Sequence, residues 1–218
     1  MRITKRLAEA ITGGLGNASK MPGPCWGIPA SACQLGAIRA KVEGSNCSIC
    51  YAHNRGRYRF ANVQDRLQAA LELWWLAEAN PNGPGHWSEA MAYLISSSGT
   101  KWFRWFHSGD LQSPGMLEAI YATCRQTPKV KHWLPTIQRN HVEAAQGETP
   151  ANLAIRYSGV MIDGQPPKWA RLSSVITSGE HRHGRHCPSH SQGNKCGECR
   201  SCWDRRVRVI EYEQNKAR

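Results

Sequence analysis

Apolar residues recur at three- and four-residue steps in the first half of the chain, which is the period of an amphipathic helix. This spacing predicts helices over 60–79 and 86–98, and Asn80-Pro81 ends the first. Their predicted apolar faces consist of Phe60, Val63, Leu67, Leu71 and Trp74 in the first, and of Trp87, Met91, Leu94 and Ile95 in the second. Before them we expect a short helix within residues 1–20, a Pro- and Gly-rich loop, and a turn or two of helix from Gln34.

The second half of the chain changes to the alternating pattern of half-buried strands. Strands are predicted over 101–107, 130–136, 153–162 and 170–178, with an edge strand over 205–213. Helices over 116–126 and 140–147 separate the first three strands. Strands interleaved with helices indicate an α/β fold with a mostly parallel sheet, either open or closed into a partial (β/α) barrel.

Small polar residues follow several of these strands, as "HSGD", "PT", "SG" and "TSG". In parallel sheets, ligand chemistry gathers at the carboxyl ends of the strands. We therefore expect a ligand-facing rim that includes Ser108, Gly109 and Asp110. The other rim positions of this kind are Thr136, Ser158 and Ser178.

The chain has 218 residues, which suggests an α/β domain over 1–180 and a small cysteine-rich, metal-binding segment over 181–218 that ends in the edge strand. No run of eighteen apolar residues exists, so we expect no membrane span. The N-terminal residues lack the apolar core of a secretory signal. A cytoplasmic protein is therefore expected, and the sequence leaves the oligomeric state open.

The formal charge of +12 is compatible with nucleic-acid binding through phosphate contacts. The basic residues are scattered, however, and none of the usual nucleic-acid-binding fingerprints is present. Nucleic acid is therefore a possible partner but not the favoured one. Arg104 and Arg156, in the middle of predicted strands, are candidates to bind a carboxylate or phosphate or to pair with a buried acid.

Nine cysteines in a reducing cytosol favour metal binding over disulfides. Cys47 and Cys50 form a C-x-x-C pair, and thirteen residues separate Cys33 from it. Three thiolates on a [4Fe–4S] cluster would leave one iron open to substrate or cofactor, by the logic of catalytic zinc. Cys25 would close the site if it joined, but its spacing favours a spectator. A redox dithiol or a zinc knuckle remains an alternative.

The most conspicuous cysteine motif is "CPSHSQGNKCGECRSC", which contains Cys187, Cys196, Cys199 and Cys202. The overlapping C-x-x-C-x-x-C run resembles the pattern that wraps a cubane iron–sulfur cluster. Four thiolates give full ligation, so this site is expected to be closed to chemistry. Zinc is the alternative metal here. Cys124, within a predicted helix, is interpreted as a core thiol.

The motifs "CSICYA", "HSGDLQS", "HWLPT", "LAIRYSGVMID" and the cysteine block, in this order, resemble the bacteriophage gene product 88 family. The resemblance covers roughly residues 19–204. It implies a phage origin and cysteine-bound metal, but no reaction. The family usually carries an acidic residue shortly after "LPT", where this chain has Gln138 nearby.

A weaker similarity links the chain to radical S-adenosylmethionine enzymes, which are partial (β/α) barrels with three cluster cysteines near the N-terminus. This similarity implies that S-adenosylmethionine binds the open iron and that Ser108-Gly109-Asp110 contacts its amino group. It also implies cofactor contacts at Thr136, Ser158 and Ser178, and an auxiliary cluster in the C-terminal block. The spacing C-x(13)-C-x-x-C departs from the usual C-x-x-x-C-x-x-C, and the aromatic Tyr51 follows the last cysteine instead of preceding it.

Two questions stay open at this point. "SGDL" is also typical of a helix cap, in which Ser108 or Asp110 would satisfy the first amides of the following helix, with Pro114 at its start. The enzyme, which would need an electron donor, competes with a non-catalytic metal-binding protein (zinc or iron–sulfur) that binds nucleic acid or a host partner. A simple electron-transfer protein is the third possibility.

Overall fold

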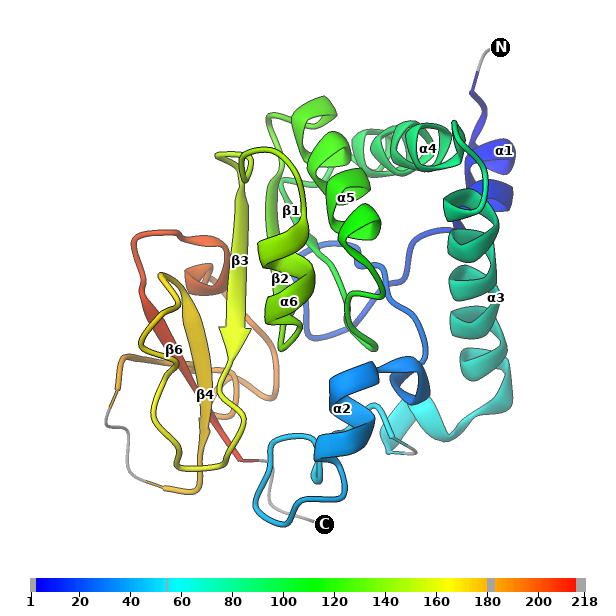
Figure 1. Cartoon of the computed structure of the whole chain (residues 1–218). Helices are drawn as coiled ribbons and strands as arrows, with labels where there is room; N and C mark the ends of the chain where they lie inside the picture. The colour runs from blue at the N-terminus through cyan, green and yellow to red at the C-terminus, as the bar shows by residue number, and fades with distance from the viewer. Residues whose placement is uncertain (1–2, 54, 180–182, 215–218) are drawn as a thin grey trace.

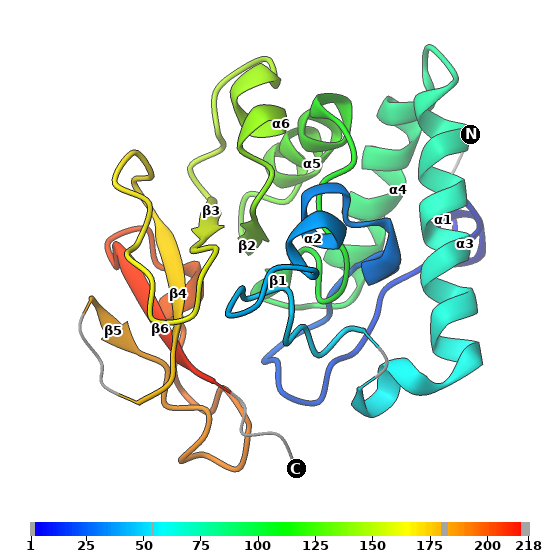
Figure 2. The ribbon, with the colours of Figure 1, turned by 60° about the horizontal axis from the view of Figure 1, so that its bottom comes forward.

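The computed structural model describes residues 3–53, 55–179 and 183–214. Within these residues, six parallel strands form one sheet in the order β1-β2-β3-β4-β6-β5. The strands are β1 (Trp102–Arg104), β2 (Lys131–Thr136), β3 (Leu153–Ser158), β4 (Ser173–Thr177), β5 (Arg185–His186) and β6 (Val209–Glu213). The sheet is curled into part of a barrel (Figures 1 and 2), so the predicted α/β fold with a parallel sheet is confirmed.

Helices cover one side of this sheet. They are α1 (Lys5–Thr12), α2 (Gln34–Arg39), α3 (Ala61–Glu78), α4 (Gly83–Ser97), α5 (Pro114–Gln126) and α6 (Arg139–Ala144). Figure 1 shows α1, α3, α4 and α5 together on the side away from β4 and β6. Helix α4 begins three residues before its predicted start, because "GPG" opens the helix with Pro84 in its first turn. No helix in the described part of the chain is long and apolar enough to cross a membrane.

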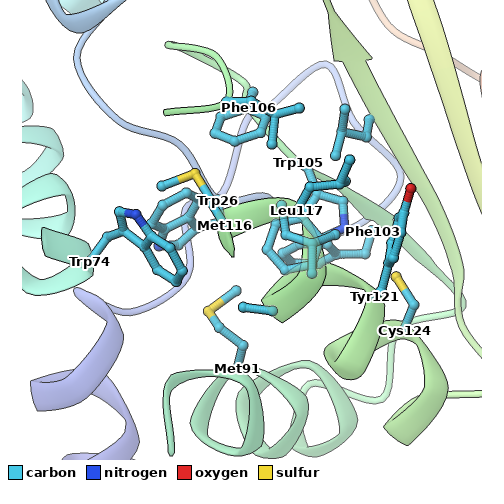
Figure 3. Close-up of a cluster of buried hydrophobic side chains, with 14 of the residues drawn as sticks. Trp26, Trp74, Met91, Phe103, Trp105, Phe106, Met116, Leu117, Tyr121 and Cys124 are labelled. Carbon is cyan, nitrogen blue, oxygen red and sulfur yellow. The ribbon is translucent and has the colours of Figure 1, made fainter. Parts of the chain in front are cut away.

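The main core lies between these helices and the sheet and is built from aromatic rings (Figure 3). Trp26 packs edge-on against Trp87 and Trp105, with ring centroids 5.3 and 6.3 Å apart. The buried faces predicted for α3 and α4 contribute Trp74, Trp87 and Met91. Cys124 is also fully buried in this core, as predicted.

Phe60 departs from the predicted apolar face of α3. Its side chain is 51% exposed, because it stands at the N-cap position, before the helix turns toward the core. The guanidinium of Arg59 lies 5.1 Å from its ring centroid. The apolar period therefore predicted the helix correctly but placed its first member wrongly.

The opposite face of the sheet carries a second cluster, in which Trp133 and Trp203 meet edge to face at 5.3 Å. Cys202 and Ile210 belong to the same cluster. The cysteine-rich segment therefore packs directly against the sheet, on the side away from α3 and α4. The boundary expected between residues 180 and 181 lies outside the described residues.

Two strand predictions need correction. β6 is not an edge strand, because the unpredicted β5 pairs with its outer side, Arg185 opposite Ile210. The predicted strand over 153–162 ends at Ser158, after which the chain turns to meet the cysteine loop.

The segment 24–28, predicted as loop, lies alongside the chain that continues from β1. Trp26 N–H donates to Arg104 O (3.0 Å), His107 N–H to Trp26 O (3.2 Å) and Ile28 N–H to Ser108 O (3.1 Å). The sheet-like pairing therefore extends beyond β1, and segment 24–28 leads directly into the cysteine loop.

Candidate cluster-binding site

The cysteine loop that follows α2 is fixed at the carboxyl end of β3. Asn46 N–H donates to Val160 O (3.0 Å) and Ile162 N–H donates to Gly44 O (2.9 Å). In Figure 2, α2 lies in the middle of the view, between the helices and strands β4 and β6. The loop is therefore held at the rim where the sequence places the ligand chemistry.

Two thiols of this loop, Cys47 and Cys50, lie near the thiol of Cys33, which stands at the N-cap of α2. A Cβ built on Gly36 would stand 3.6 Å from Cys33 Sγ and 3.8 Å from Cys47 Sγ. Cys50 is close enough to raise the pKa of both thiols through charge repulsion. The structure thus brings together the three residues that sequence spacing grouped.

Two of these thiols, Cys33 and Cys47, are not poised to ionise by themselves. Burial is the largest cause that raises the pKa of Cys33, and it also raises the pKa of Cys47, to about 11. Asp110 raises both pKa values further, whereas Arg39 lowers that of Cys47. Thiolates at this place therefore need a bound cation to offset their charge.

The described residues contain no group of three or more His, Cys, Asp or Glu side chains set around a single metal ion. Ligands of one tetrahedral zinc crowd around a point about 2.3 Å from each sulfur. A cubane cluster instead takes one thiolate on each iron, so its ligands stand further apart.

The turn Ser108-Gly109-Asp110 lies next to the cysteine loop. Gly109 has φ +79°, and a Cβ there would stand 2.3 Å from Ile28 Cγ1 and 2.8 Å from Ile28 O. Only glycine fits this close backbone approach. Ser108 Oγ is buried and lacks a hydrogen-bond partner within the described chain. A buried hydroxyl of this kind is available to a ligand.

Asp110 is buried and held by the end of β2. Its Oδ1 accepts from Leu111 N–H (2.8 Å) and its Oδ2 from Ile137 N–H (2.9 Å), while Thr136 also bonds the carboxyl. Burial raises the pKa of Asp110 to about 6, and these hydrogen bonds oppose the rise. Asp110 and Thr136, predicted separately, are therefore one unit of the site.

The helix-cap interpretation of this turn is wrong. The N-cap of α5 is Ser113, whose Oγ accepts from Met116 N–H at 3.0 Å. Pro114 begins the helix, as expected. Asp110 bonds the chain after β2 instead, so its orientation is set from outside the helix.

The remaining rim residues lie further along the sheet. Ser158 ends β3 opposite Ser174, immediately before the stretch that docks on the cysteine loop. Ser178 follows β4, where its hydroxyl donates to Asp163 Oδ2 at 2.6 Å. Ser178 is exposed and engaged by Asp163, and no contact ties it to the cysteine loop within the described residues. The structure therefore groups Asp110 and Thr136 with the thiols and leaves Ser178 apart.

The four C-terminal cysteines form the second group, on the opposite face of the sheet. Cys187 and Cys196 are close enough to raise the pKa of Cys202, which burial as the largest cause brings to about 12. Burial is the largest cause that raises the pKa of Cys196, and charge repulsion from Cys187 and Cys199 raises it further. Tyr212 O–H and Cys202 Sγ lie 3.2 Å apart.

Basic residues surround this second group. Lys20 and Arg104 lower the pKa of Cys196, and Arg156 lowers that of Cys202, although burial outweighs these charges. A fully ligated, net negative metal site would be stabilised by such neighbours.

Both strand arginines have roles that the sequence did not indicate. Arg156 is fully buried but binds neither acid nor ligand, because its guanidinium donates to backbone carbonyls of the cysteine segment. Arg104 stacks 4.5 Å from the Trp133 ring and donates to Tyr51 O–H (3.2 Å). Arg104 thus links Tyr51, next to Cys50, to the face that carries the second cysteine group.

Cys25 lies outside both groups. It is 1% exposed and bridges to Gly16 and Arg104 through its backbone. Burial raises the pKa of its thiol more than Arg104 lowers it. This placement agrees with the expected spectator.

Sequence reasoning missed two residues beside the site. Tyr58 O–H and His107 Nδ1 are 2.9 Å apart, and Tyr51 O–H donates to His107 O at 2.8 Å. His107 immediately precedes the Ser108 turn, and that adjacency was the signal available in the sequence.

A family model described as Gene product 88 matches residues 11–205. The chain belongs to this bacteriophage family. The resemblance drawn from the ordered motifs is thereby confirmed over most of the chain. No curated protein matches the chain, and no solved structure matches it. The family name carries no reaction, so function has to be argued from the site itself.

Proposed function

We propose that this gene product 88 protein is an iron–sulfur enzyme that binds a [4Fe–4S] cluster through Cys33, Cys47 and Cys50. S-adenosylmethionine is the proposed ligand of the open iron. The single observation that carries this proposal is the meeting of the three thiols beside Asp110 at the carboxyl end of the sheet. The C-terminal cysteines are proposed to hold a second, closed cluster, with zinc as the alternative metal there.

The donor set supports this assignment. Cys33 and Cys47, whose pKa values are raised by burial and by repulsion from neighbouring thiols, gain most from a cationic cluster. The order of elements along the chain also supports the proposal. Segment 24–28 pairs beside β1 and leads into the cysteine loop, and the Ser108 turn follows β1, as in a partial barrel whose cofactor site lies at the carboxyl ends of its strands. A cluster held by these three thiolates, once reduced by an external electron donor, would supply one electron to the sulfonium of this cofactor and so start radical chemistry.

The residues around the thiols have distinct proposed roles. The Asp110 carboxylate receives the ammonium group of the cofactor and is oriented for it by Ile137 N–H and Thr136. Gly109 lets the backbone approach the ligand closely, and Ser108 Oγ offers an unused hydrogen bond. Asp110 ionises with a pKa of about 6, so its carboxylate form predominates at neutral pH.

Metal analysis of anaerobically purified protein tests the proposal. We expect about eight irons per chain, or about four with one zinc, from the ligand counts of the two groups. S-adenosylmethionine is expected to change the EPR spectrum of the reduced wild-type cluster. A cluster whose spectrum ignores the cofactor would leave an electron-transfer protein as the better description.

Serine variants assign the ligands. Cys33→Ser is expected to remove the cofactor-sensitive signal and leave the C-terminal metal in place. Cys25→Ser is the matched control, because Cys25 is also a buried thiol near the N-terminus but lies outside the group. Equal iron loss in both variants would contradict the assignment of Cys33 as a specific ligand.

A second candidate function, nucleic-acid binding, is favoured by one specific surface. A groove of about 490 Å³ is lined by four arginines, one lysine and a tryptophan that is 48% exposed. These residues are Lys168, Trp169, Arg171, Arg205, Arg206 and Arg208. Asp204 neutralises Arg206 through an ion pair of 2.9 Å, which leaves a strongly positive groove suited to phosphates.

Binding of a single-stranded oligonucleotide at increasing salt tests this candidate. We expect affinity to fall steeply with salt and to drop in Arg171→Glu, while Arg59→Glu, on the helical side of the molecule, is the charge-matched control. Affinity that is independent of salt, or equally reduced in both variants, would argue against the groove.

A further inference from the structure

A cavity of about 210 Å³ lies between the glycine-rich turn after α1 and the first turns of α3. No cysteine is among the described residues that line it; Tyr58, in the buried cluster against which Cys50 packs, meets His107 of the cavity wall through its hydroxyl. The polar and glycine residues that line it are Gly14, Gly16, Arg57, Asn62, Arg66 and His107.

Two arginines are anchored at its mouth. Arg57 Nη1 donates to Asn17 O at 2.9 Å, and Arg66 Nη2 donates to Leu15 O. Each of these bonds uses one of the five N–H groups of a guanidinium, so donors remain for a ligand. The turn that carries both carbonyls also forms the cavity wall, which fixes the two positive charges beside it.

No acidic side chain lines this cavity within the described residues. Glu9 lies just outside the lining: its Cγ and Arg66 Nη2 would stand 3.4 and 3.8 Å from a Cβ built on Gly14, and its Oε1 is 3.9 Å from Lys5 Nζ. Among the described lining residues, the charged side chains are therefore both arginines, Arg57 and Arg66.

His107 supplies an unused polar atom at the inner wall. His107 is only 7% exposed, and its Nδ1 is hydrogen-bonded to the Tyr58 hydroxyl at 2.9 Å. Its Nε2 lies 3.1 Å from a Cβ built on Gly16 and has no hydrogen-bond partner in the described part of the chain. Burial and the nearby Arg104 lower the pKa of His107 to about 3, so the ring is neutral. A buried, neutral ring nitrogen that faces a cavity calls for a polar ligand atom.

We propose that this cavity binds a phosphate group, either as inorganic phosphate or as the end of a small phosphomonoester. Arg57 and Arg66 match the two charges of a phosphate dianion, and the Asn62 amide and His107 Nε2 are left for its remaining oxygens. A larger residue at Gly16 would fill the space, because its Cβ would approach both His107 Nε2 and Cys25 Sγ (3.2 Å). This site stands apart from the cluster and does not depend on it.

Calorimetric titration of the full chain with inorganic phosphate, methyl phosphate and acetate tests the proposal. We expect saturable one-to-one phosphate binding, weakened about tenfold or more in Arg66→Gln and in Asn62→Asp. Both positions are exposed, so the variants are expected to fold. Tighter binding of methyl phosphate would identify a phosphomonoester, and tighter binding of phosphate would identify the free ion.

Arg59→Gln is the matched control, because it removes the same charge two residues from Arg57 but stacks on Phe60 outside the cavity. The proposal is overturned if phosphate does not saturate, if acetate binds as tightly, or if Arg59→Gln weakens binding as much as Arg66→Gln. Repeating the titration in Cys33→Ser separates the two proposals, since phosphate binding is expected to survive the loss of the cluster.

Discussion

Arg156 Nε, in the middle of β3, donates a hydrogen bond of 2.8 Å to the backbone carbonyl of Cys202. The same guanidinium reaches the carbonyls of Ser201 (3.0 Å), Asp204 (2.7 Å) and Val207 (2.8 Å). One fully buried cation therefore holds the turn that presents the last cysteine of the C-terminal group. The cysteine block is clasped to the sheet through this side chain as well as through its aromatic contacts.

Replacing Arg156 by Lys should release this turn. A lysine ammonium cannot reproduce the planar fork, so several buried carbonyls would lose their donors. We expect the free energy of unfolding to fall by about 3 kcal/mol or more. We also expect the metal proposed for the C-terminal cysteines to be lost and the one proposed for Cys33 to be retained. Urea unfolding and metal content per chain measure both effects. Arg205→Lys is the control, since Arg205 bonds a part-buried carbonyl at Pro150 (3.4 Å) and an exposed one at Ala151 (3.1 Å), and a similar loss there would argue against the clasp.

Replacing Gly109 by Ala should disrupt the turn that carries Asp110. The new Cβ would stand 2.3 Å from Ile28 Cγ1 in a backbone with φ +79°. We expect a loss of about 2–4 kcal/mol in the free energy of unfolding, combining overpacking with left-handed strain. Gly99→Ala isolates the strain, because Gly99 has φ +67° with nothing within 4 Å of its Cβ, and should cost only about 1 kcal/mol. Equal thermal shifts in the two variants would contradict the close approach at Ile28.

Most of the fold could be predicted from the spacing of apolar residues, because each long helix or strand buries a regular apolar face. Helix α3 and strands β2 and β3 lie within a few residues of their predicted positions. The strand β5 and segment 24–28 were missed, since they are held by backbone bonds to distant chain and need no alternating pattern.

The candidate site could be predicted from the sequence only where ligand chemistry requires a particular spacing of residues. The grouping of Cys33 with Cys47 follows from ligand geometry, and the Ser108 turn follows from its place after a strand. The bonding of Asp110 to Ile137 and of Arg156 to the cysteine segment was not accessible. In both cases the partners are backbone groups, which any residue type would provide, so they leave no trace in the sequence.

Replacing Gly36 by Ala should separate the two metal sites. Its Cβ would stand 2.8 Å from Cys33 Cβ, so Cys33 would have to shift from its present position beside Cys47. We expect loss of the cofactor-sensitive iron with the C-terminal metal intact, as measured by iron content and EPR. Gly85→Ala, in α4 with nothing near its Cβ, should instead keep both metals and gain up to about 1 kcal/mol in stability. Retention of the full iron content in Gly36→Ala would contradict the proposed placement of Cys33.

His132 should make stability depend on pH. It is fully buried in β2, its Nε2 lies 2.8 Å from Thr127 Oγ1, and burial lowers its pKa to about 3. Because the folded pKa lies below the unfolded value of about 6.5, its contribution is complete above pH 6.5 and is lost as the pH falls toward 3. Between pH 7 and 4.5 we expect the wild type to lose about 2–3 kcal/mol more than His132→Phe, which cannot titrate.

Urea unfolding across this pH range measures the difference between the two proteins, so that contributions from every other titrating group cancel. Thr127→Val is the control, because it removes the hydrogen bond to Nε2 but keeps the buried imidazole. It should be less stable than the wild type at neutral pH and still steepen with acid, since desolvation of the ring is the cause of the lowered pKa. Parallel stability curves for wild type and His132→Phe would contradict a lowered pKa of His132 in the folded protein. They would show instead that β2 opens before His132 is charged, so that the ring takes up a proton without resistance from burial.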